Sequence, residues 1–123
     1  FKLYFNTNSH QLYSTGYLLT KDAQNWYHDQ YLRSDEDRDD WRVSPAFVED
    51  LTGVASAYVL TCGYDPLLDE GKEYANKLEQ AGVDVTYRCY EGQVHGFITM
   101  GKGIDEAKDA IFEIADAVAN SFE

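Results

Sequence analysis

The sequence predicts an α/β fold in which parallel strands are joined by crossover helices. Residues 1–45 are polar, aromatic and irregular, whereas from Ser44 onward strand-like and helix-like patterns alternate. The order strand, helix, strand, helix with short connections is typical of a parallel pair of strands. With 123 residues the chain is long enough for one domain with a core.

The irregular first part contains one helix-like segment, from Asp22 to Leu32. Four apolar or aromatic residues fall on one of its faces, so we expect that face to be packed: Ala23, Trp26, Tyr27 and Tyr31. Together with Trp41, the three aromatic residues of this face suit packing of the segment or part of a lid over a ligand pocket. The acidic run from Ser34 to Asp40 is expected to be a solvated loop, because like charges repel one another.

The first strand is expected from Ala55 to Cys62, since this almost continuously apolar run is typical of a strand covered on both faces, and Gly63 breaks it. A helix with an apolar stripe follows, and Gly82 is expected to close it as a C-cap residue. The stripe consists of Leu67, Leu68, Tyr74, Ala75, Leu78 and Ala81.

The second strand is expected over Val83 to Tyr90, where apolar and polar residues alternate as in a strand near a sheet edge. The last helix begins near Asp105 and Glu106, whose charges suit the positive N-terminal end of a helix dipole. Its apolar positions repeat at helical spacing: Ala107, Ala110, Ile111, Ile114, Ala117 and Val118.

The charge balance argues against several classes of partner. Ten Lys and Arg stand against 22 Asp and Glu, a net charge of −12, which would repel nucleic acid or an anionic membrane. No apolar run approaches the roughly 20 residues that span a bilayer. Cys62 and Cys89 lie in apolar strand-like runs, which suits free thiols in a reducing compartment. We therefore expect no nucleic acid, no membrane span and a cytoplasmic location.

Two residues with catalytic potential follow the two strands. Ligands of parallel sheets bind beyond the carboxyl ends of the strands; Asp65 comes just after the first strand and His95 just after the second. Adjacent strands lie about 5 Å apart, so the two side chains can meet. Together they predict the acid and base half of a nucleophilic triad, in which the carboxylate orients the imidazole and the imidazole moves the proton.

Each of these residues has another interpretation when it is taken alone. Asp65 can be a helix N-cap with Pro66 at the first helical position, and His95 can be a loop histidine bound to the backbone. Their pairing after consecutive strands, with the acid before the histidine, favours the triad. Asp69 and Glu70 compete for the acid role, but they fall in the first turns of the helix.

Several segments carry a more specific pattern, namely Ser44-Pro45-Ala46, Tyr64 to Gly71, Ala81-Gly82-Val83 and Tyr90 to Phe97. With them, roughly residues 16–120 resemble the C-terminal part of the hormone-sensitive-lipase-like esterases, which have the α/β-hydrolase fold. The resemblance implies a serine carboxylesterase or lipase that acts on short-chain acyl esters without a metal or other cofactor. It places Asp65 at the position of the triad acid and His95 at that of the triad base.

The nucleophile of such an enzyme is not expected in this chain. Neither a G-x-S-x-G elbow nor an HGGG-type oxyanion motif occurs in it, and Ser14, the nearest substitute, lacks the first glycine. Because an α/β-hydrolase needs roughly twice this length, we expect a truncated, inactive fragment. Residues 1–45 would form an inserted, cap-proximal segment between core strands, and 46–123 the C-terminal core.

Two other motifs are incomplete. The run Gly96 to Lys102 approaches a phosphate-binding loop, but Gly103 occupies the position of the Mg²⁺-binding hydroxyl. The run Asp35 to Asp39 begins like a calcium loop, but Asp40 stands where the turn glycine belongs. Neither phosphate nor metal binding is therefore expected.

Fold and triad do not fix the substrate, so rival functions remain open. One is a serine peptidase or another acyl hydrolase of the same fold. Another is a non-catalytic ligand-binding member, like the plant gibberellin receptors that resemble these esterases; His95 disfavours it, because those receptors replace the triad histidine. The edge-like strand Val83 to Tyr90 is also expected to pair with a second copy, since the family's dimers form in that way.

Overall fold

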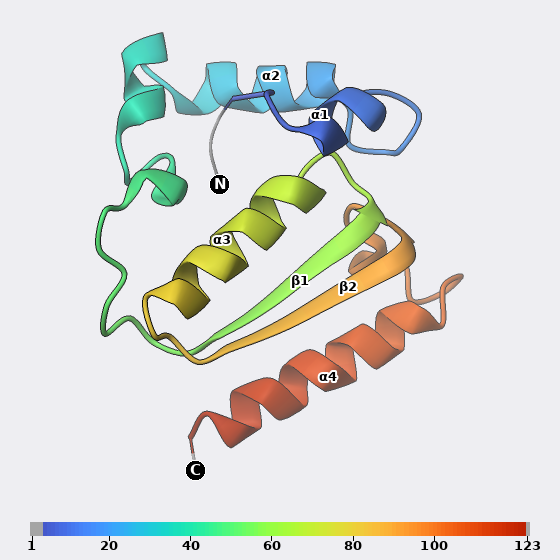
Figure 1. Cartoon of the computed structure of the whole chain (residues 1–123). Coiled ribbons are helices and arrows are strands. Elements are labelled where there is room, and N and C mark those ends of the chain that lie inside the picture. Colours follow the sequence, from blue (N-terminus) through green and yellow to red (C-terminus); the bar gives the residue numbers. More distant parts are fainter. Residues whose placement is uncertain (1–3, 123) are drawn as a thin grey trace.

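The chain forms a parallel two-stranded sheet with one helix on each face. The structure, a computed structural model, describes residues 4–122. Strands β1 (Ala57–Tyr64) and β2 (Val85–Val94) pair in parallel and are joined by α3 (Leu68–Gln80). Figure 1 shows α3 and α4 (Glu106–Asn120) on opposite sides of the strands. The predicted order of strand, crossover helix, strand and helix is confirmed.

The first part of the chain lies beyond the carboxyl ends of the strands. It contains α1 (Asn8–Leu12), α2 (Lys21–Tyr31) and the short 3-10 helices η1 (Asp35–Asp39) and η2 (Pro45–Phe47). In Figure 1, α1 and α2 lie at the end of the sheet to which both arrowheads point. The segment thus covers the edge where the sequence predicts the chemistry.

Two apolar clusters fill the faces of the sheet. On the α4 side, Cys62 and Tyr90 pack with Phe97, Ala107 and Ala110. On the α3 side, the buried members are Leu51, Leu78 and Val83. Because successive residues of a strand point to opposite faces, both strands contribute to both clusters. The α4-side cluster lies near the carboxyl end of β1, whereas the α3-side cluster, in which Ala57, Val59 and Val85 also pack, lies near the beginnings of the strands.

The predicted C-terminus of α3 is confirmed in detail. Gly82 has a φ of 80°, which glycine adopts without strain. Its N–H donates to the carbonyl of Glu79, and the N–H of Val83 donates to the carbonyl of Leu78. These two bonds form a Schellman motif. Leu78 and Val83 also share one apolar cluster, so the chain turns directly from α3 toward β2.

The predicted strand ends were wrong. We expected Gly63 to break the first strand, but β1 continues to Tyr64. A side chain at Gly63 would overlap the backbone of Glu91, so the glycine permits a close approach of the strands. We also expected the second strand to end at Tyr90, whereas β2 continues to Val94. A pattern of local residue types does not reveal such a contact between strands.

The predictions for the first part were wrong in two places. The aromatic face of α2 is not packed within the described residues, because Trp26, Tyr27 and Tyr31 are exposed and Gln24 is the buried residue. The acidic run is not a loop but contains the 3-10 helix η1. Arginines offset its charges: Arg33 pairs with Asp37, and further pairs join Arg38 to Asp35 and Arg42 to Asp40.

Candidate active site

The two side chains predicted to act together are hydrogen-bonded at the carboxyl ends of the strands. His95 Nδ1 lies 2.8 Å from Asp65 Oδ2. Asp65 is buried, with 5% of its surface exposed, whereas the His95 imidazole is 43% exposed. The pair therefore has a sheltered acid and an imidazole that a substrate can reach.

The carboxylate of Asp65 is fixed by a second hydrogen bond. Its Oδ1 accepts from the backbone N–H of Leu67 at 2.8 Å, and its carbonyl accepts from the N–H of Leu68 at 3.1 Å. Helix α3 has Leu67 at its N-cap position, so Asp65 stands two residues before the position of the alternative interpretation, although its Oδ1 makes the kind of bond to a following N–H that a capping aspartate makes. Oδ2 is left to face His95.

An irregularity of the sheet and a buried anchor set the place of His95. Cys62 pairs with Tyr90 and Tyr64 pairs with Val94, so β2 uses two more residues than β1 between these pairs. After His95, Gly96 adopts a φ of 74°, a left-handed conformation that suits glycine. Phe97, 1% exposed, then enters the core and packs on Tyr90 with ring centroids 5.0 Å apart.

The electrostatics suit a proton-transferring histidine. The hydrogen bond to Asp65 raises the pKa of His95 from its ordinary value, against the opposing effect of burial. Because a carboxylate only accepts hydrogen bonds, the neutral ring carries its proton on Nδ1. Nε2 then has the free lone pair that can take a proton from a nucleophile.

A second polar cluster, which the sequence analysis missed, lies on α1 against the start of α3. Ser9 is 2% exposed and His10 is 5% exposed. His10 Nδ1 lies 2.7 Å from Thr7 Oγ1, and burial lowers the pKa of His10. Ser9 is hydrogen-bonded to Pro66 and Asp69.

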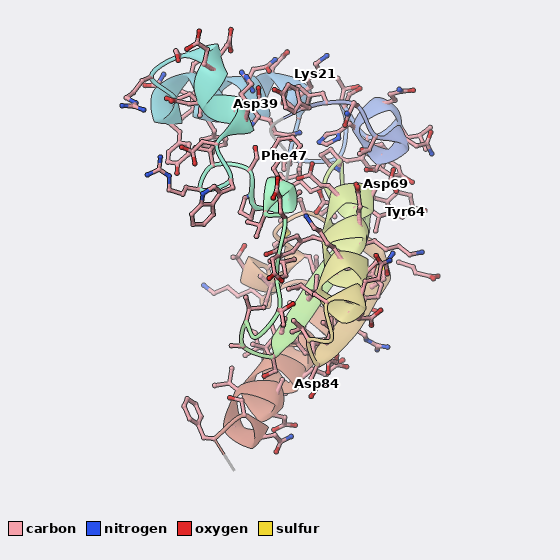
Figure 2. All side chains as sticks on the ribbon, turned by 60° about the vertical axis from the view of Figure 1, so that its left-hand side comes forward. Lys21, Asp39, Phe47, Tyr64, Asp69 and Asp84 are labelled. Atoms are coloured by element: carbon pink, nitrogen blue, oxygen red, sulfur yellow. The ribbon has the colours of Figure 1, made fainter. Side chains whose placement is uncertain are left out.

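Figure 2 shows Asp69 and Tyr64 beneath α1 at the same end of the sheet, with Asp84 at the opposite end.

The other candidate residues, and the two cysteines, have different surroundings from Asp65 and His95. Ser14 lies just after α1, and its hydroxyl donates to the carbonyl of Gln11 at 3.4 Å. Glu70, the rival acid, is buried with its Oε2 3.7 Å from His10 Nε2. Cys62 and Cys89 are free thiols, as predicted, and burial raises the pKa of Cys62 to about 12. A buried thiol of this kind is a poor nucleophile.

Residues 4–122 lack two further kinds of feature. They contain no group of three or more His, Cys, Asp or Glu side chains placed to hold a metal ion. None of the helices described there is long and apolar enough to cross a membrane.

Comparison with known proteins identifies the family. The family model of the alpha/beta hydrolase fold matches residues 3–99. The chain belongs to this family, and its resemblance to the hormone-sensitive-lipase-like esterases is confirmed. It is 45% identical over 95 residues to the carboxylic ester hydrolase LipN of Mycobacterium tuberculosis, covering 76% of this chain and 25% of that protein. It is 38% identical over 108 residues to an ethyl acetate hydrolase of Pseudomonas putida, covering 88% and 34%.

Solved structures agree with this assignment. An ester hydrolase from the metagenome of Lake Arreo, in complex with a bipyridine phosphonate derivative, superposes with a TM-score of 0.90 at 38% identity, over 94% of this chain and 37% of that chain. A hyperthermophilic esterase from Pyrobaculum calidifontis has a TM-score of 0.90 at 34% identity, over 95% and 39%. The chain thus spans between a quarter and two fifths of the length of these relatives.

Proposed function

We propose that this chain supplies the orienting acid, Asp65, and the general base, His95, of a serine ester hydrolase that acts on short-chain acyl esters. The observation that carries the proposal is the 2.8 Å hydrogen bond between His95 Nδ1 and Asp65 Oδ2 at the carboxyl ends of β1 and β2. Ligands bind at that end of a parallel sheet. Relatives named as a carboxylic ester hydrolase and an ethyl acetate hydrolase support the ester as substrate.

The geometry suggests how the two residues act. His95 Nε2 takes the proton of a serine hydroxyl as that oxygen attacks the ester carbonyl, and later gives the proton to the leaving alcohol. Asp65 keeps the ring in the Nδ1–H tautomer and stabilises the imidazolium that forms. The nucleophile and the oxyanion donors come from sequence outside these 123 residues, because the G-x-S-x-G and HGGG-type motifs are absent here.

The experiment that tests this function compares ester and amide substrates. The full-length protein that contains these residues is assayed with p-nitrophenyl esters of increasing acyl length and with matched p-nitroanilides. We expect turnover of the short esters, falling with acyl length, and little turnover of the anilides. Preference for the anilides would replace the esterase by a peptidase, and inactivity on both would favour a ligand-binding protein.

We also propose a homodimer in which the free edge of β2, over Val83 to Tyr90, pairs with a second copy. Within the described residues the sheet has two strands, and a free strand edge offers unpaired N–H and carbonyl groups.

The cytoplasmic location stays a prediction, which the two free thiols support.

A further inference from the structure

Helix α3 begins without a side-chain cap of its own. Its N-cap residue, Leu67, provides no side-chain hydrogen bond. Ser9 on α1 provides one instead: its hydroxyl accepts from the backbone N–H of Asp69 at 3.2 Å. In return, the carboxylate of Asp69 accepts from the backbone N–H of Ser9 at 2.8 Å. This reciprocal pattern is that of a capping box, formed here between two segments that lie 60 residues apart.

The same hydroxyl also holds the connection that carries the triad acid. Ser9 Oγ donates to the carbonyl of Pro66 at 2.8 Å, and Pro66 directly follows Asp65. Both Ser9 and Pro66 are fully buried. Inside a protein such bonds are stronger than in water, because no solvent competes for the partners. One side chain thus fixes the residue after Asp65 and the first turn of α3.

We propose that Ser9 is a positioning residue: it caps α3 from another segment and thereby holds the Asp65 carboxylate against His95. Asp65 lies in the short connection between the end of β1 and the start of α3, and only Pro66 and Leu67 separate it from α3. Without the Ser9 bonds this connection has more conformations, and the 2.8 Å bond to His95 is populated less. The consequence for catalysis rests on the proposed function, whereas the positioning of Asp65 does not.

The chain offers a matched control for the loss of a buried hydroxyl. Ser44 is also fully buried, and its hydroxyl donates to the carbonyl of Arg38 at 2.7 Å. Ser44→Ala therefore removes a comparable side-chain bond from the same part of the chain. It leaves the contacts of Pro66 and Asp69 unchanged.

The test measures the pKa of His95 by NMR titration in the full-length protein. Asp65 is the charged group that raises this pKa, so Ser9→Ala is expected to lower it by roughly half a unit or more. The acid limb of the kcat/KM profile should move by the same amount, and Ser44→Ala should move neither. An unchanged His95 pKa in Ser9→Ala, or an equal shift in Ser44→Ala, would overturn the proposal.

A second pair of variants decides the matter if Ser9→Ala does not fold. Asp69→Asn and Asp69→Ala both remove the charge, but only the asparagine keeps an oxygen that accepts from the Ser9 N–H. We expect a lower His95 pKa in Asp69→Ala than in Asp69→Asn, because only the alanine leaves the Ser9 N–H without its acceptor; equal values would refute the reciprocal capping through which Ser9 is proposed to hold Asp65. If the unaltered protein hydrolyses no ester, the proposed function fails, while the titration still decides the positioning.

Discussion

Asp65 gives His95 a measurable pH signature. A general base must be neutral to accept a proton, and Asp65 raises the pKa of His95 above its ordinary 6.5. Because activity is lost as the ring protonates, the acid limb of kcat/KM is expected to have its midpoint above pH 6.5. A pH–rate profile of the full-length enzyme checks this, and a midpoint at or below that value contradicts it.

Asp65→Asn should lower that midpoint and reduce kcat/KM by about a thousandfold or more, because the amide neither stabilises the imidazolium nor favours the Nδ1–H tautomer. Asp105→Asn is a suitable control, since Asp105 is exposed and pairs only with Lys108 among the ion pairs seen here. Near-normal rates in Asp65→Asn would show that the carboxylate is not the orienting acid.

At the residue scale the sequence analysis predicted that Asp65 and His95 meet, but it did not predict the contacts of Ser9 that hold the chain next to Asp65. Asp65 and His95 stand next to strand-like runs, so their place at the sheet edge follows from local patterns. Ser9 meets Pro66 and Asp69 across 57 and 60 residues. Nothing in the residues around Ser9 signals these contacts, because they depend on how the first part of the chain folds over the sheet.

At the scale of the elements, strands β1 and β2 approach each other closely at Gly63, just before the ends that carry Asp65 and His95. A methyl group there would overlap the backbone of Glu91, at the point where β2 uses its extra residues. Gly63→Ala is therefore expected to destabilise the fold by about 1–3 kcal/mol, as overpacking does. It should also reduce kcat, because the same irregularity leads into His95.

The free energy of unfolding from urea titration measures the first effect. Gly92→Ala is the control, since a methyl group at Gly92 meets nothing within 4 Å. If both variants lose the same free energy, Gly63 is not needed for the approach of the strands. The sequence analysis predicted that Gly63 breaks the first strand. That prediction failed because the residue that requires the glycine, Glu91, lies on the other strand, and a pattern of neighbouring residues does not reveal it.

The whole molecule leaves apolar surface exposed within the described residues. Ile111, Phe112 and Val118 of α4 are 48%, 68% and 52% exposed. An open groove of about 510 Å³ runs between the last turns of α4 and the beginnings of the strands. The prediction that Ile111 and Val118 pack is wrong for the described residues, because only Ala107 and Ala110 of the predicted α4 stripe are buried there.

We therefore expect these 123 residues alone to associate in solution and to hydrolyse no ester, because exposed apolar patches favour association and the serine nucleophile is missing. The full-length protein is expected to sediment as a dimer through β2. Analytical ultracentrifugation of both, with an ester assay on each, provides the comparison. A monomeric full-length protein would contradict the dimer, and turnover by the 123 residues would contradict the missing nucleophile.

The central claim is that His95 is the base of an ester hydrolase. The measurement is hydrolysis of a short-chain p-nitrophenyl ester by the full-length protein, its His95→Ala variant and a His28→Ala control, in which a histidine that stacks on Phe5 is removed. We predict that His95→Ala loses about a thousandfold or more in kcat while His28→Ala stays within a few-fold. Full activity in His95→Ala, or an unaltered protein that is inactive at every acyl length, would contradict the claim.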